Sequence, residues 1–207
     1  MKLYFLAIFL LIYSHAAYAP MFEIMSQEAT PTGMPKKNAL EAIQTIIANR
    51  SNPNILISEH YALWYAANYG EYELAHKLLK LGANPDLTST TQCTTALEQS
   101  LHMAKLDVFE LLLAYNANPN RLLAQTSIVR KTYLHWLSMS HNYLPLPQRL
   151  LATQILLSYG AQINVRLIFM DNPGLTVLEY ARAEIPGSPL LLLLEDHAKE
   201  FKLQKLA

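Results

Sequence analysis

This chain of 207 residues has few of the groups that usually carry catalysis or cross-linking. Its single cysteine, Cys93, excludes an internal disulfide, so stability has to come from packing. Charged residues make up 15% of the chain and the formal net charge is zero, which removes the basic footprint expected of a nucleic-acid or membrane-surface protein. The sequence contains no phosphate loop, nucleophile elbow, paired-carboxylate motif or His-Glu-x-x-His, so we expect no enzyme and no cofactor.

A metal site is also not expected. His135 and His141 are close in sequence, but no Asp, Glu or Cys completes a ligand set at the spacing that metal sites use. Cys93 has no basic neighbours that would lower the pKa of its thiol, which argues against a reactive role.

The longest apolar run near the N-terminus is short. Lys2 precedes 11 apolar residues, Leu3 to Tyr13, and small residues follow. This order is typical of a secretory signal peptide, and the run is too short for a comfortable membrane span. We therefore expect residues 1–16 to be cleaved after Ala16 and the protein to be exported, to the periplasm or beyond if the source is bacterial. An uncleaved signal anchor is the alternative. Residues 17–37 contain three prolines and are expected to form a flexible lead-in.

What the chain does contain is a repeat. The segment LLKLGANPD begins at residue 78, and degraded copies begin at residues 46, 112 and 156 as IIANRSNPN, LLAYNANPN and LLSYGAQIN. The copies are 32, 34 and 44 residues apart. A recurring unit of this length is typical of a solenoid, in which each repeat buries its apolar face against its neighbours.

A second landmark precedes the copies at residues 78, 112 and 156, and a fourth example follows the last of them. It reads YALWYAA from Tyr61, TALEQSL from Thr95, TYLHWL from Thr132 and TVLEYA from Thr176. From Leu63 to Gly82 and from Leu97 to Asn116 the distance is 19 residues in both cases. This pattern resembles the ankyrin repeat, whose consensus has Thr-Pro-Leu-His-x-Ala-Ala followed by Leu-Leu-x-x-Gly-Ala-x-x-Asn. The resemblance covers about residues 38 to 197.

The resemblance implies an all-α fold, an ankyrin-repeat solenoid of paired antiparallel helices with projecting hairpin loops. We divide it into a partial N-cap (38–55), three full repeats (56–89, 90–126 and 127–170) and a C-cap repeat (171–207), together the domain 38–207. Thr95, Thr132 and Thr176 are expected to cap first helices, whereas Gly82, Asn116 and Gly160 are expected to close second helices in the left-handed conformation. Paired leucines should form a stacked ladder: Leu78, Leu79, Leu112, Leu113, Leu156, Leu157, Leu193 and Leu194.

Two departures from the consensus matter. The consensus histidine survives only as His135, because Trp64, Glu98 and Glu179 occupy the other copies. Between Leu134 and Gly160 the distance is 26 residues instead of 19, which places a seven-residue insertion at 141–147. Its two prolines predict a loop and not a longer helix. The insertion is either a partner-specific contact or tolerated surface variation, and the sequence favours neither.

In ankyrin proteins, partners meet the hairpin tips and the surface made by the first helices. Alignment to the family therefore gives candidate partner-binding residues at the tips, at first-helix ends and near second-helix ends: His60, Gln92, Ile128, Val129 and Lys131; Asn68, Tyr69, His102 and Met103; Tyr115 and Tyr159. Two alternatives stay open. The two second-helix tyrosines can be partial core that leans over the next repeat, and Ile128 and Val129 can pack inside a lengthened loop.

These observations predict an exported, monomeric ankyrin-repeat protein that binds another protein. An inhibitor or immunity partner of an exported enzyme, or a secreted effector that captures a host protein, are its sharper forms. No nucleic acid and no membrane contact beyond the export signal are expected. A chaperone-like or structural role in the cell envelope is the first rival, and an unrecognised enzyme is a lower one.

Overall fold

The computed structural model describes residues 34–89, 93–123, 129–140, 142–169 and 172–204. The chain divides near residue 38 into two units, and the repeated segments all lie in the second, residues 39–207. The expected signal peptide, most of the expected lead-in, Gln92, Ile128 and His141 lie outside the described residues.

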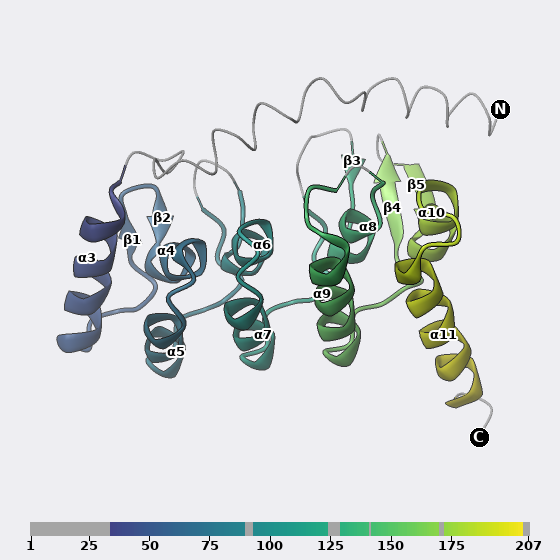
Figure 1. Cartoon of the computed structure of the whole chain (residues 1–207). Coiled ribbons are helices and arrows are strands. Elements are labelled where there is room, and N and C mark those ends of the chain that lie inside the picture. Colours follow the sequence, from purple (N-terminus) through teal and green to yellow (C-terminus); the bar gives the residue numbers. More distant parts are fainter. Residues whose placement is uncertain (1–33, 90–92, 124–128, 141, 170–171, 205–207) are drawn as a thin grey trace. The chain divides into compact units, whose positions relative to one another are not determined.

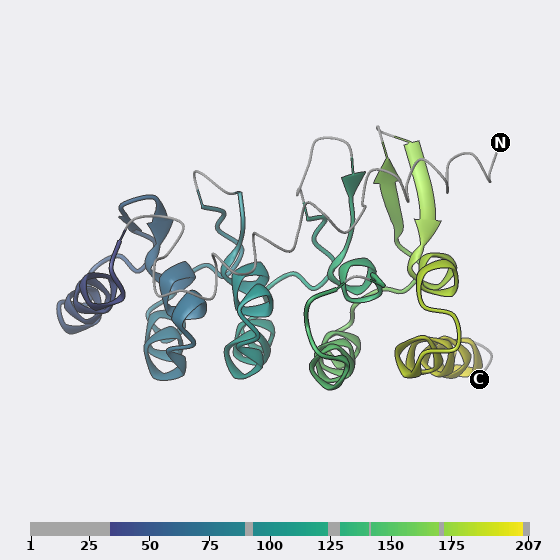
Figure 2. The ribbon, with the colours of Figure 1, turned by 45° about the horizontal axis from the view of Figure 1, so that its top comes forward.

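The second unit consists of helix pairs joined by short strands. In chain order the helices are α3 (Lys36–Ala48), α4 (Ala62–Tyr69), α5 (Tyr72–Lys80), α6 (Ala96–His102), α7 (Leu106–Ala114), α8 (Tyr133–Leu137), α9 (Leu146–Ser158), α10 (Val177–Glu184) and α11 (Pro189–Gln204). The first helices of the pairs, α4, α6, α8 and α10, form one layer, and the second helices α5, α7, α9 and α11 form the other (Figures 1 and 2). The expectation of a mainly helical stack is confirmed for the described residues.

Short hairpins precede the first helices. Strand β1 (Leu56–Ile57) pairs with β2 (His60–Tyr61) in antiparallel fashion. Strands β3 (Val129–Arg130), β4 (Arg166–Phe169) and β5 (Asn172–Thr176) form a three-stranded antiparallel sheet in the order β3-β4-β5, which ties two successive pairs together and was not predicted. A Cβ at Gly174 would meet the buried side chain of Leu167, which would have to move to make room for it.

The ends of the helices follow the predicted chemistry. The Thr95 hydroxyl accepts a hydrogen bond from Glu98 N at 3.1 Å, and Thr176 makes the equivalent bond with Glu179 N at 3.3 Å. Gly82, Asn116 and Gly160 have φ angles of 91°, 65° and 82°. The residue after each of them donates back to a leucine carbonyl one turn earlier, so these left-handed residues satisfy the carbonyls at the end of the helix.

The core lies between the two layers. Within the predicted ladder Leu78, Leu112, Leu156 and Leu194 have no solvent exposure, and their immediate partners are buried or half-buried. Ala66 and Ala67 are also fully buried, and α4 packs against α6 there. Small side chains let these first helices approach closely.

The loops after the second helices form a ladder of their own. Asn54 Oδ1 accepts from Asn84 N at 2.8 Å, Asp86 Oδ1 accepts from Asn118 N at 3.0 Å, and Asn120 Oδ1 accepts from Gln162 N at 2.7 Å. Each loop is therefore bonded to the next one along the stack. This is the structural use of the recurring Asn-Pro-Asn and Asn-Pro-Asp segments.

The prediction for the insertion is wrong in one respect. Helix α9 has 13 residues, whereas α5 and α7 each have nine, so part of the insertion lengthens the second helix. Leu146 and Pro147 belong to its first turn, where a proline is tolerated because that turn needs no intrahelical N–H donor. The first helix is shortened instead: α8 has five residues, compared with eight in α4 and seven in α6.

Candidate functional site

Three of the predicted contact residues have enclosed side chains. His60 is fully buried and stacks on the Trp64 ring, with 3.6 Å between ring centroids. Asn68 is 4% exposed and its Oδ1 accepts from Gln99 Nε2 at 2.6 Å. Lys131 is 3% exposed and its Nζ lies 3.1 Å from Met139 Sδ. The expectation that these side chains face a partner is therefore wrong, because each is buried against other residues of the fold.

Five predicted residues keep some exposure. Tyr69, His102, Met103 and Tyr115 are half-buried, and Tyr159 is 36% exposed. Tyr69 stacks on Tyr65 with ring centroids 6.4 Å apart. The Tyr115 ring meets the edge of His76, 5.9 Å away on the preceding second helix, so it packs against the earlier pair. These five remain available for contact with a partner.

Of the remaining candidates only Val129 lies within the described residues. Val129 lies in β3, where it pairs with Phe169 of β4. Gln92 and Ile128 lie outside the described residues, so their candidacy stays a prediction.

The insertion supplies an aromatic group that the alignment did not identify. The Tyr143 hydroxyl donates to His102 O at 3.1 Å, across to the end of α6. Trp136 lies between them, with its ring 5.1 Å from that of His102 and 5.5 Å from that of Tyr143. Burial raises the pKa of Tyr143 and lowers that of His102 to about 4, so both rings are uncharged near neutral pH. The one signal in the sequence was a tyrosine inside the extra segment.

The residues that flank the insertion contact α10 and the end of α8. Ser140 Oγ donates to Glu184 Oε2 of α10 at 2.8 Å. The buried Arg149 donates from Nε to Leu137 O at 2.7 Å and from Nη2 to Met139 O at 3.0 Å, which satisfies carbonyls at the end of α8. Burial lowers the pKa of this guanidinium, and the two carbonyls compensate in part for the lost hydration. The loop is thus a fixed bridge between the neighbouring pairs.

In two pairs the residue at the position of the consensus histidine connects its pair to the next hairpin. Trp64 Nε1 donates to Thr94 Oγ1 at 3.0 Å. His135 Nδ1 lies 2.8 Å from Thr132 Oγ1, and its Nε2 lies 3.2 Å from Leu175 O, an arrangement that fits a proton on Nε2. His135 therefore has a structural role, because it links Thr132 to the next hairpin. Burial lowers the pKa of His135 to about 4.

Glu98 occupies the same position in the α6–α7 pair. Its side chain is 3% exposed, and burial raises its pKa to about 7, opposed by the charge of Arg121. Burial therefore favours the protonated form of this carboxyl group in the folded protein.

The described residues contain no cluster of three His, Cys, Asp or Glu side chains that would hold a metal ion. Cys93 is exposed, with a φ of 53° at the turn position where the family has glycine. Within the described parts of the chain, none of the helices combines the length and apolar character of a bilayer-spanning segment.

Comparison with known families gives one match. A family model for the ankyrin repeat matches residues 59–90, which is almost the whole of the first full repeat predicted at 56–89. A search of curated proteins finds no relative that matches the chain. The matched segment comprises α4, α5 and the start of the next hairpin, and it supports an ankyrin-repeat protein with a protein–protein interaction role.

Proposed function

We propose that this chain is an exported ankyrin-repeat module that binds another protein through its hairpin tips and the ends of its first helices. The ankyrin match and the helical stack support the interaction role. The observation that carries the proposal is a set of four side chains at the ends of the first helices α4 and α6 and in the loop after α8: Tyr69, His102, Met103 and Tyr143. We call these residues the helix-end row.

The helix-end row has the properties of an anchor. Three of its members are half-buried and Tyr143 is 41% exposed, so each is fixed by packing yet reachable from solvent. Rigid rings offer a large contact area at a small entropic cost. His102 is neutral above about pH 4, and no Asp, Glu, Lys or Arg occurs from Thr132 to Gln148. The partner surface is therefore apolar or aromatic at its centre.

The sharper forms of the proposal are an inhibitor or immunity partner of an exported enzyme, and a secreted effector. Either requires one stable complex that buries at least about 1,200 Å². The N-terminal sequence pattern supports export. Sequencing the mature N-terminus tests that part: Ala17 as the first residue supports cleavage, whereas an intact Met1 contradicts it.

Affinity capture with residues 17–207 as bait tests the binding role. A variant bait carries Tyr69→Ala, Met103→Ala and Tyr143→Ala. The control bait carries Tyr72→Ala and Leu151→Ala, which alter exposed side chains on the second helices α5 and α9. We expect one stoichiometric partner that is retained by the control and lost by the helix-end variant. A diffuse set of preys, equal for all three baits, would instead favour the chaperone-like role.

A further inference from the structure

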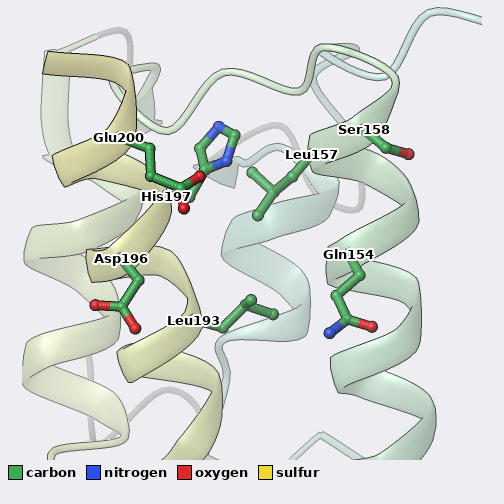
Figure 3. A pocket seen from close by; sticks show the side chains of 7 residues that line it. All are labelled: Gln154, Leu157, Ser158, Leu193, Asp196, His197 and Glu200. Atoms are coloured by element: carbon green, nitrogen blue, oxygen red, sulfur yellow. The ribbon is translucent and has the colours of Figure 1, made fainter. Parts of the chain in front are cut away.

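A groove lies between the second helices α9 and α11. Its floor is apolar and consists of Leu157 of α9 and Leu193 of α11. Gln154 and Ser158 line it from α9, and Asp196, His197 and Glu200 line it from α11 (Figure 3). Its volume is about 300 Å³, at the lower end of the range for binding pockets.

The two walls differ in charge. The α9 wall carries an amide and a hydroxyl, which are neutral, whereas two carboxylates project from α11 at Asp196 and Glu200. Lys199 Nζ lies 2.9 Å from Asp196 Oδ1, but their side chains are 71% and 69% exposed. An exposed ion pair within one helix contributes little free energy, so an incoming cation can exchange with this lysine.

The helices that form the groove are long for this stack. Helix α11 has 16 residues and α9 has 13, compared with nine in α5 and α7. The groove takes up only part of that length, because its lining residues lie within 154–158 of α9 and 193–200 of α11, about one and two helical turns. An apolar floor about two turns long between neighbouring helices provides the geometry in which a short amphipathic segment docks.

We propose that this groove is a second docking site, and that it binds an amphipathic segment of a protein partner in which lysine or arginine flanks an apolar side chain. The apolar side chain occupies the space above Leu157 and Leu193. The cationic side chains pair with Asp196 and Glu200, and the neutral α9 wall offers them no repulsion. The one-sided charge of the walls sets the orientation of the segment.

This site goes beyond the function proposed above, because it lies between second helices and not at the first-helix ends or hairpin tips. The two can therefore fail independently. Helix-end variants are not expected to alter peptide binding in the groove, and groove variants are not expected to alter capture by the helix-end row.

The probe is a fluorescein-labelled amphipathic peptide of about four helical turns, with leucines on one face and flanking lysines. A second peptide replaces every lysine by glutamate. Binding to the full chain is followed by fluorescence anisotropy. One variant, Asp196→Asn with Glu200→Gln, removes the acidic wall, and another, Ser158→Trp, fills the groove from an exposed position. Matched controls on α7 are Asp107→Asn with Glu110→Gln, and Ala114→Trp, all at exposed residues.

We expect the lysine peptide to bind the unaltered chain and both α7 controls equally. Loss of the two carboxylates should weaken binding roughly three- to tenfold, and the weakening should shrink as salt is added. The tryptophan at 158 should also weaken it, whereas the glutamate peptide should not bind. Equal weakening by the α7 controls, equal binding of both peptides, or no binding of the lysine peptide would each overturn the proposal. Circular dichroism of every variant confirms that the comparison is made on folded protein.

Discussion

The α6–α7 and α8–α9 pairs share the same elements and differ in the turn between their two helices. Both begin with a threonine cap, bury a leucine pair and close on a left-handed residue. They differ where the first helix passes into the second: α6–α7 turns within three residues, whereas α8 ends early at Leu137 and α9 begins at Leu146. The stack therefore constrains the residues that face a neighbouring pair, and it tolerates extra length at the turn between the helices.

Truncating a ladder leucine, which both pairs share, should have the largest effect on stability. The loss should be the same in both pairs. Leu112→Ala and Leu156→Ala each remove a side chain with no solvent exposure. Each should lower the free energy of unfolding by about 2–5 kcal/mol, because a cavity remains between the layers. Urea denaturation measures this. Leu151→Ala, at a 48% exposed position on α9, is the control and should be nearly neutral. A loss below about 1 kcal/mol at Leu156 alone would mean that the insertion has loosened its pair.

Glu98 of α6 and His135 of α8 should respond to pH with opposite signs. Glu98 has its pKa raised from 4.5 to about 7 in the folded protein, so the stability it contributes is present below about pH 4.5 and is lost as the pH rises through 7. His135 has its pKa lowered from 6.5 to about 4, so its contribution is present above about pH 6.5 and is lost as the pH falls towards 4. Each effect is at most on the order of 3 kcal/mol.

The substitutions that test this are Glu98→Gln and His135→Gln, with urea denaturation repeated between pH 4 and 8. Glu98→Gln should flatten the loss of stability towards neutral pH. His135→Gln should reduce the loss towards acid, and part of that loss should remain because burial lowers the pKa of His102 to about 4 as well. Unchanged pH profiles in both variants would contradict the assignment of these groups.

The features that the sequence predicted are those set within a single pair. Threonine caps, left-handed closing residues and the leucine ladder depend on neighbours a few residues away, and their chemistry is the same in every copy. Burial of His60 and Lys131 was missed, because alignment gives a position in the hairpin but not the packing of its side chain. Tyr143 was missed because its partner, the carbonyl of His102, is 41 residues away and is reached only once the insertion folds back.

Removing the hydrogen bond from Tyr143 to His102 should have a moderate effect on stability. Tyr143→Phe removes the hydroxyl that donates to His102 O and keeps the ring against Trp136. We expect a loss of about 0.5–1.5 kcal/mol in unfolding free energy and faster hydrogen exchange in the loop at 138–145. Tyr72→Phe on the regular α4–α5 pair, whose ring is 39% exposed, is the matched control. Equal effects of the two changes would show that the hydroxyl does not hold the insertion.

The smallest effect should come from the ladder of loops. Asn120 makes two bonds, from Nδ2 to Gly160 O at 3.2 Å and to Oδ1 from Gln162 N at 2.7 Å, whereas Asp86 has no amide to make the first of these. Asn120→Asp should therefore cost about 0.5–1.5 kcal/mol, because one carbonyl loses its donor. Asp86→Asn adds a donor towards the end of α7 and should be neutral or stabilising by a few tenths of a kcal/mol. Thermal unfolding of the two reciprocal variants is the measurement. If both lower the melting temperature equally, the loops are held only by the bonds from backbone N–H groups to side-chain oxygens, and the amide of Asn120 contributes nothing to the junction that carries the insertion.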